Sequence, residues 1–310
     1  MKVGIIDLGT NTFNLLIAEI DDLGGYKQVY RSKIGVKLGE GSFEKNYITE
    51  EAMERALVAL QAQISVIKNQ YCDRILAFAT SAVRNASNGQ QFVDKVYAMF
   101  QVRIKVIDGE QEASMIFQGV QMSGALDDEK ALIMDIGGGS TEFIISNDQE
   151  IIWKQSYELG VTRLIEKIKP NDPILPEEII QLKKYLSDQI AEVFEVVRDE
   201  NVHVLVGSSG SFETFSDLIC TRKGTIEEDG LKSALNINVA ELDDLINELI
   251  RTTVAERQAM PGMAAIRANI IVMSAIFVQL IMEECDINEV KLSRYALKEG
   301  VLFDVLKGNL

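Results

Sequence analysis

The sequence is poor in the residues that bind zinc and form disulfides. It contains one histidine and three cysteines, and the cysteines are isolated along the chain with no CxxC pair. A zinc site made of cysteine and histidine needs several such residues at short spacings, and a disulfide framework needs paired cysteines. Both are therefore excluded, and the isolated thiols indicate a reducing compartment.

Proline and long apolar runs are also scarce. The 310 residues include only four prolines and no low-complexity tract, so we expect an ordered protein. The most apolar stretch, residues 270–282, is too short to span a bilayer and predicts a buried core helix. The chain begins directly with a strand-like segment, which leaves no room for a signal peptide. We therefore expect a cytoplasmic protein without a membrane partner.

Positive charge is in short supply as well. Lys and Arg number 31 against 47 Asp and Glu, a net charge of −16, and almost all of the excess lies after residue 125. Such a balance argues against nucleic acid or an anionic membrane surface as a partner. A polyanionic ligand would depend on local basic groups. We expect such a ligand to lie against the first part of the chain, which is nearly neutral.

What the sequence does contain is one pattern written twice. Residues 4–17 read GIIDLGTNTFNLLI, and residues 132–145 read LIMDIGGGSTEFII. Each copy has an apolar run, an aspartate, one aliphatic residue, a glycine, small residues and a second apolar run. This order predicts a strand, a tight turn and a second strand. Two ordinary β-turns that share a glycine are the alternative.

The repeated pattern is suited to phosphate and metal. Glycine lets the backbone approach an anion, and successive N–H groups can hold a phosphate. Asp7 and Asp135 stand at strand ends, where a carboxylate can hold a metal over that phosphate. Two such loops, with strands and helices alternating around them, predict an α/β protein of two related domains that face each other across a cleft.

The turn-rich segment 123–128 marks the predicted boundary between these domains. We assign residues 1–125 to the first domain and 126–310 to the second. A final helix from about residue 296 to residue 306 is free to pack back on the first domain.

With a single histidine, acid–base chemistry depends on carboxylates. Glu142 follows Asp135 by seven residues, so both could return to one phosphate. Glu110 and Glu112 follow a strand, and they either act in the site or complement a helix N-terminus. Arg84 either clamps a phosphate or forms a surface ion pair.

The single histidine lies elsewhere. We expect His203 to be structural, inside a strand over residues 202–206. That strand ends in a third loop of small residues, 207–211.

Several segments occur together in the order of one known family. They are DLGTNTFNLLI, ATSAVRNASN, VIDGEQEASMIFQGV, MDIGGGSTEF, LGVTRL, VGSSGSFET and LSRYALKEGVL. On these segments the whole chain resembles the exopolyphosphatase/guanosine pentaphosphate phosphohydrolase family of the actin–hexokinase–Hsp70 superfamily. The resemblance implies two ribonuclease-H-like α/β domains with the active site in the cleft between them.

The resemblance also implies an activity, a cofactor and roles for particular residues. Such an enzyme removes the terminal phosphate from inorganic polyphosphate, or the 5′ γ-phosphate from guanosine pentaphosphate, with Mg²⁺ or alternatively Mn²⁺. At the matching positions Glu112 activates water, Arg84 contacts phosphate, and Asp135 and Glu142 are linked to metal and water, with Asp7 as a further metal candidate. The implied phosphate-binding residues are Thr10, Asn11, Thr12, Gly137, Gly138, Gly139, Ser140, Thr141, Ser209, Gly210 and Ser211.

The sequence departs from the family pattern at two cation positions. Ser114 stands where many members carry arginine, and Asn14 where arginine or histidine is common. We do not expect the helical domains that extend longer members of the family. We therefore expect short polyphosphate or a nucleotide as substrate. A homodimer is one way to lengthen the groove that binds polyphosphate. Guanosine pentaphosphate hydrolysis, a kinase of the same superfamily and a non-hydrolytic phosphate sensor stay open as alternatives.

Overall fold

The computed structural model describes residues 1–41, 46–225 and 232–310. The chain folds into two compact units. Unit 1 comprises Met1–Gly119 and Leu297–Leu310, and unit 2 comprises Val120–Ala296. Each unit is built around its own β-sheet.

In unit 1 the described residues form a five-stranded sheet in the order β3-β2-β1-β4-β5. The first three strands are antiparallel, and β1, β4 and β5 are parallel. The elements are β1 (Lys2–Leu8), β2 (Thr12–Ile20), β3 (Tyr26–Gly35), α1 (Glu50–Asn69), β4 (Arg74–Ala79), α2 (Ser81–Arg84), α3 (Gly89–Phe100), β5 (Ile104–Val106), α4 (Gly109–Ser123) and α13 (Leu297–Leu306).

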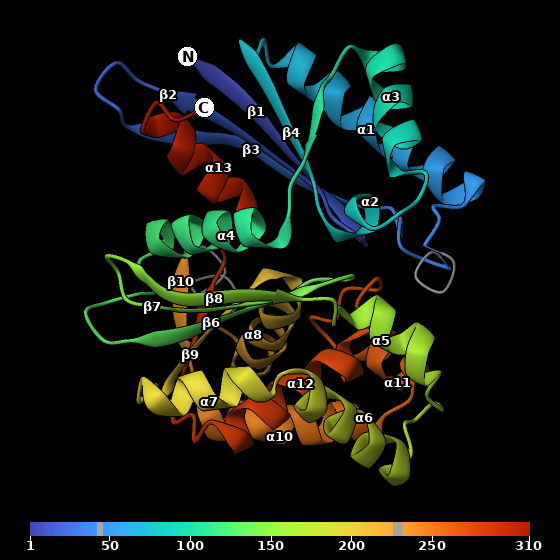
Figure 1. Ribbon diagram of the computed structural model, residues 1–310, viewed down its shortest axis with the longest axis vertical. Helices are drawn as coiled ribbons and strands as arrows, with labels where there is room; N and C mark the ends of the chain where they lie inside the picture. Colours follow the sequence, from blue (N-terminus) through green and yellow to red (C-terminus); the bar gives the residue numbers. More distant parts are fainter. Residues whose placement is uncertain (42–45, 226–231) are drawn as a thin grey trace. The chain divides into compact units, whose positions relative to one another are not determined.

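Helices cover both faces of the unit 1 sheet (Figure 1). α1 and α3 pack on the face that carries Ile6, Leu8 and Phe13. α13 contacts β1 and β2 on the opposite face. The start of α1 is capped by Thr49, whose side chain accepts a hydrogen bond from the N–H of Ala52 at 3.2 Å.

In unit 2 the described residues form a six-stranded sheet in the order β10-β11-β9-β6-β7-β8. β6, β7 and β8 are antiparallel, and β6, β9 and β11 are parallel. The elements are β6 (Ala131–Ile136), β7 (Thr141–Ser146), β8 (Ile151–Tyr157), α5 (Val161–Ile168), α6 (Pro176–Gln189), α7 (Ala191–Asp199), β9 (Val204–Ser208), α8 (Ser209–Lys223), β10 (Ala234–Ile237), α10 (Val239–Arg251), α11 (Val254–Ala259), α12 (Ile271–Glu284) and β11 (Glu289–Ser293).

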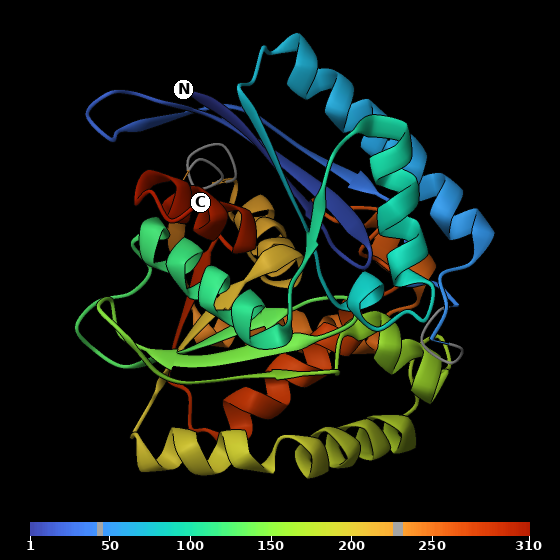
Figure 2. The ribbon, with the colours of Figure 1, turned by 45° about the horizontal axis from the view of Figure 1, so that its top comes forward.

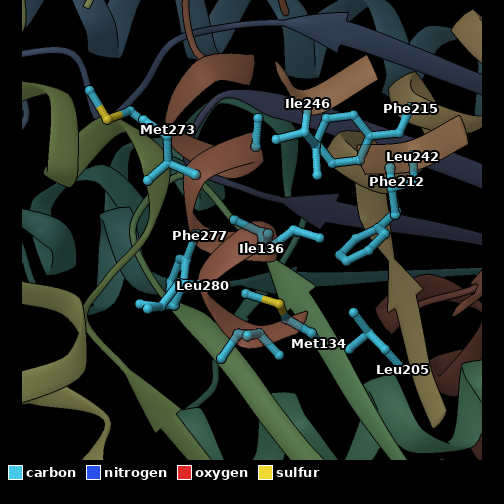
Figure 3. Packing of buried hydrophobic residues seen from close by; sticks show 14 of the residues in the cluster. Met134, Ile136, Leu205, Phe212, Phe215, Leu242, Ile246, Met273, Phe277 and Leu280 are labelled. Atoms are coloured by element: carbon cyan, nitrogen blue, oxygen red, sulfur yellow. The ribbon is translucent and has the colours of Figure 1, made fainter. Parts of the chain in front are cut away.

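The core of unit 2 lies between its sheet and its helices. Figure 3 shows Met134 and Ile136 of β6 packed with Phe212 of α8 and Phe277 of α12. α12 is the apolar stretch for which the sequence predicts a buried helix, and that prediction is confirmed. Figure 2 shows α6 and α7 running end to end along this unit.

The two sheets share one plan. In each, an antiparallel three-stranded meander is followed by two parallel strands, and unit 2 adds β10 at the edge. This plan confirms the α/β fold of two related ribonuclease-H-like domains. No helix among the described residues is long and apolar enough to cross a membrane.

Two local predictions are wrong. Residues 207–211 do not form a loop, because β9 passes directly into α8 at Ser209. Small residues are favoured in loops, but they also permit a tight strand-to-helix junction. His203 lies just before β9 rather than within it, and its backbone carbonyl accepts from the N–H of Asn288 at 3.0 Å.

The two units divide the chain near the predicted boundary but not at it. Unit 2 begins at Val120, within α4, whereas the sequence places the boundary after residue 125. Residues 297–310 belong to unit 1. The turn signal at 123–128 marks the end of α4, which both units share.

Candidate active site

The two glycine turns have the same backbone hydrogen bond. The N–H of Gly9 donates to the carbonyl of Thr12 at 3.1 Å, and the N–H of Gly137 donates to the carbonyl of Ser140 at 3.0 Å. A Cβ added at either glycine would lie 2.9 Å from that same carbonyl oxygen, so a larger residue requires a shift. The predicted strand–turn–strand structure is confirmed for both copies.

In the first turn, the carbonyl groups are held by the segment that follows β3. The Thr10 carbonyl accepts from the N–H of Gly39 at 3.1 Å. The Asn11 carbonyl accepts from the N–H groups of Val36 at 2.8 Å and Lys37 at 3.0 Å. These contacts fix the orientation of two successive peptide units.

In the second turn, α5 has the same role. The carbonyls of Gly137 and Gly138 accept from N–H groups in the first turn of α5, at 3.0 and 2.9 Å. Arg163 Nε donates to the carbonyl of Gly139 at 3.1 Å. Gly160 precedes α5 against this turn, where a Cβ would overlap the backbone of Gly138.

The fixed carbonyls determine where the N–H groups point. In a planar trans peptide unit the C=O and the following N–H point in opposite directions. Carbonyls held by α5 therefore direct the N–H groups of residues 138–140 to the other side of the turn. Successive N–H groups on one side form a concavity suited to an anion.

A polar row crosses the unit 2 sheet next to the second turn. Asp135 is paired in register with Glu142 and Ser208, and Glu142 is paired with Ser156. Ser208 Oγ and Ser209 Oγ each donate to Asp135 Oδ2 at 2.7 Å, and Ser156 Oγ donates to Glu142 Oε1 at 2.7 Å. Both carboxylates are buried, 5% and 1% exposed. Strand alternation places the row on the face opposite to Met134 and the helical core.

The corresponding row in unit 1 has a different charge. Asp7 is paired in register with Asn14, whose Nδ2 donates to Asp7 Oδ2 at 2.9 Å. An amide thus stands where the second repeat has a carboxylate. Unit 1 has one acidic group at this place and unit 2 has two.

Unit 1 holds a buried ion pair near the ends of β4 and β5. Arg84 Nη1 donates to Glu112 Oε2 at 2.8 Å and to the carbonyl of Ile107 at 3.1 Å. The two side chains are only 16% and 9% exposed, so Arg84 does form an ion pair but not on the surface. α4 brings Glu112 here because Asp108 Oδ1 accepts from the N–H of Gln111 at 2.8 Å and caps its first turn.

The junction of β9 and α8 packs against a cation that the sequence pattern does not reveal. Ser209 has a φ of 65°, in the left-handed region. The guanidinium of Arg267 lies against Gly210, where any Cβ would overlap it. Burial lowers the pKa of Arg267, while the charges of Glu213 and Asp135 act in the opposite direction.

Two hydroxyls among the predicted site residues are engaged inside unit 2. Ser211 Oγ lies 2.8 Å from Ser274 Oγ, and both residues are buried. Thr141 Oγ1 donates to the carbonyl of Leu159 at 3.2 Å. These side chains support the elements around the site.

The donor set in the polar row is compatible with a hard divalent cation. Among the described residues, no group of three or more His, Cys, Asp or Glu is placed to hold a metal. Mg²⁺ is commonly held by only one or two carboxylates together with water and substrate phosphate. Asp135 and Glu142 supply two buried, adjacent carboxylates of this kind.

The sequence matches the Ppx/GppA phosphatase family over residues 16–309. The chain belongs to the Ppx/GppA phosphatase family. As a member of this family it is a hydrolase that acts on phosphoanhydride bonds.

Curated relatives within the Ppx/GppA family carry phosphatase names. The chain is 27% identical to exopolyphosphatase 1 of Mycobacterium tuberculosis over 303 residues, which cover 97% of this chain and 87% of the relative. It is 30% identical over 288 residues to a bifunctional 3-dehydroquinate synthase/phosphatase of Fusobacterium nucleatum. That match covers 90% of this chain but only 42% of the longer relative.

Solved structures of the Ppx/GppA family have the same fold. An exopolyphosphatase from Cytophaga hutchinsonii superimposes with a TM-score of 0.95 at 34% identity, covering 99% of this chain and 98% of that one. The Ppx/GppA protein of Aquifex aeolicus gives a TM-score of 0.80 at 24% identity over 100% and 99% of the chains.

The structure brings predicted site residues together in two groups. Asp135, Glu142 and Ser209 meet in unit 2, and Arg84 meets Glu112 in unit 1. The sequence reasoning missed Arg267 and Ser156, because neither lies within a glycine turn. The role of each residue in catalysis stays a prediction.

Proposed function

We propose that this chain is an exopolyphosphatase that removes terminal phosphate from inorganic polyphosphate with Mg²⁺. The observation that carries the proposal is the polar row of unit 2, where two buried carboxylates lie side by side next to a glycine turn. Burying two adjacent carboxylates is costly unless a cation or hydrogen bonds stabilise them. The names of the relatives from Mycobacterium tuberculosis and Cytophaga hutchinsonii support polyphosphate as the substrate.

Asp135 and Glu142 are the residues that would hold Mg²⁺. When bound, the ion would neutralise charge on the phosphoryl oxygens. The N–H groups of residues 138–140, held toward one side by α5, bind phosphate oxygens. The N–H groups of the first turn, held by residues 36–39, bind phosphate in the same way.

Glu112 accepts the proton of the attacking water, and Arg84 binds a phosphate oxygen. Arg84 holds the Glu112 carboxylate at 2.8 Å, which fixes its position in the first turn of α4. A carboxylate is sufficient because phosphoryl transfer needs positioning and charge stabilisation more than covalent chemistry.

The test is phosphate release by the wild type, Glu112→Gln and Glu110→Gln across a titration of Mg²⁺ and Mn²⁺. The substrates are short polyphosphate, long polyphosphate and guanosine pentaphosphate. Glu110→Gln is the matched control, since Glu110 lies in the same first turn of α4 and is exposed. We expect metal-dependent release that falls about 10²- to 10⁴-fold in Glu112→Gln and stays near wild type in Glu110→Gln.

The outcomes of this assay decide between the two substrates, the sensor alternative and the role of Glu112. Faster release from guanosine pentaphosphate than from any polyphosphate would overturn the assigned substrate. Binding without release under either metal would support a sensor. Equal release by the wild type and Glu112→Gln would contradict Glu112 as the base.

A further inference from the structure

In both glycine turns the backbone carbonyls are bound by groups outside the turn, but the groups differ between the two units. In unit 2 the carbonyls of the turn are bound by α5 and by Arg163. In unit 1 they are bound by the segment 36–39, which is not helical. A segment without regular structure needs a further support to keep its N–H groups in place.

Arg55 supplies that support in unit 1. From α1 its Nε donates to the carbonyl of Val36 at 2.9 Å, and its Nη2 donates to the carbonyl of Lys37 at 3.0 Å. The N–H groups of these same two residues hold the Asn11 carbonyl. Arg55 is therefore linked to the first turn indirectly, through the backbone of Val36 and Lys37.

Arg163 acts on the second turn directly. Its backbone N–H donates to the carbonyl of Gly138 at 3.3 Å, and its Nε donates to the carbonyl of Gly139 at 3.1 Å. Its Nη2 pairs with Glu158. The planar guanidinium thus spans the turn and the end of the β8 segment, a geometry that lysine does not reproduce.

We propose that Arg163 and Arg55 are positioning residues that direct the N–H groups of the two turns toward phosphate. The inference rests on the proposed function, in which both turns bind phosphate. Each arginine fixes carbonyl orientation, and the planar peptide carries that orientation over to the next N–H. Neither residue needs to touch the substrate.

The alternative is that each arginine only makes an exposed ion pair, Arg163 with Glu158 and Arg55 with Glu40. Glu158→Gln separates the two explanations, because it removes the charge partner and leaves the Gly139 contact. Arg222→Ala is the matched control, since Arg222 forms an ion pair with Glu248 at 2.8 Å on the same unit but is attached to neither turn.

The experiment measures hydrogen exchange of the full chain with and without inorganic phosphate, together with kcat, KM and Tm. In the wild type we expect phosphate to protect residues 9–12 and 137–141. Arg163→Ala should lose protection only at 137–141, and Arg55→Ala only at 9–12. The kcat/KM of each should fall about 10- to 100-fold, the scale of a misplaced binding group.

Added guanidinium ion should partly restore kcat/KM in Arg163→Ala, because the Arg163 side chain is partly exposed, at 22%, so solvent reaches its site in part. Glu158→Gln and Arg222→Ala should keep the wild-type protection. Unchanged phosphate protection in Arg163→Ala and Arg55→Ala would overturn the proposal. So would a Glu158→Gln effect as large as that of Arg163→Ala.

The two proposals fail in different ways. A wild type that is protected by phosphate but releases none from polyphosphate would refute the proposed function, while the exchange data would still decide the role of the arginines. A wild type with no phosphate protection at either turn would overturn the positioning role itself.

Discussion

One residue difference between the two repeats changes the charge beside the glycine turn. Asn14 in unit 1 occupies the register position that Glu142 occupies in unit 2. Asn14 donates a hydrogen bond to Asp7, whereas Glu142 adds a second negative charge beside Asp135. Facing residues on neighbouring strands lie about 5 Å apart, so the two carboxylates of the second pair repel each other when no metal ion is bound.

This difference predicts opposite effects on Tm for two substitutions, each of which gives one repeat the charge of the other. Glu142→Gln should raise Tm by about 2–4 °C without metal, because an amide relieves the repulsion, and should abolish stabilisation by Mg²⁺. Asn14→Asp should lower Tm without metal, since it creates a facing pair in unit 1. Calorimetry with Mg²⁺ and with a chelator measures both.

A Glu142→Gln variant that is still stabilised by Mg²⁺ as strongly as the wild type would show that the ion binds elsewhere. Ser156→Ala serves as the control for disturbing the row without changing its charge. Because Ser156 donates to Glu142, this variant should lower Tm and keep the response to Mg²⁺.

The residues of the turns could be predicted from the sequence because their signal is local. An aspartate, an aliphatic residue and a glycine at a strand end define the turn within a few positions. Arg163 and Arg267 could not be predicted in this way. Their partners, Gly139 and Gly210, are 24 and 57 positions away, and only the fold brings them together.

At the scale of elements, the start of α6 depends on a carboxylate. Glu178 accepts hydrogen bonds from the N–H of Leu175 at 2.8 Å and from the N–H and side-chain amide of Asn171. The bond from Leu175 is the main cause that lowers the pKa of Glu178 from 4.5, with Asn171 adding to it. The ionised form therefore stabilises the folded state.

The lowered pKa gives the sign of a pH dependence. Because the folded pKa lies below the unfolded value, the stabilisation is fully present above about pH 4.5 and is lost as the pH falls through the folded pKa. Glu178→Gln should lower Tm by about 1 °C at pH 7, and the difference should vanish in acid. Glu177→Gln, in the same first turn of α6, is the control. A difference that persists unchanged at pH 3 would rule out the charge as its cause.

Element boundaries show where sequence reasoning succeeds and where it does not. The helix after Thr49 and the helix opening at Pro176 could be predicted because their first residues carry capping and charge signals. The junction at Ser209 could not. Gly-Ser-Ser-Gly-Ser is typical of a loop by composition, whereas in the fold Phe212 packs against Gly207 and Arg267 against Gly210, contacts that the local sequence does not reveal.

At the scale of the whole molecule, unit 1 is completed by the end of the chain. The C-terminal helix α13 belongs to the same unit as the N-terminal strand β1, and Figure 2 marks the two ends of the chain. α13 contacts β1 and β2, and Asp304 Oδ1 accepts from Gln118 Nε2 at 2.9 Å. Unit 2, in contrast, is one continuous stretch of chain. The sequence repeat predicts two related domains, and the sequence leaves the final helix free to pack back on the first of them, where α13 lies.

The packing of α13 in unit 1 depends on Gly300, where α13 crosses α4. A Cβ at Gly300 would overlap the carbonyl of Met115, and a helix backbone cannot move aside as a side chain can. Gly300→Val should therefore displace α13 and destabilise unit 1 by about 1–3 kcal/mol, the usual cost of overpacking. Hydrogen exchange should rise across β1 and β2 and stay unchanged in β6 and β7, because unit 2 is complete without α13.

Gly308→Ala is the control, since a Cβ there meets no atom within 4 Å and only the φ of 76° adds strain. Exchange that rises equally in both sheets would mean that the units unfold as one, and the chain's return would then stabilise the whole molecule rather than unit 1.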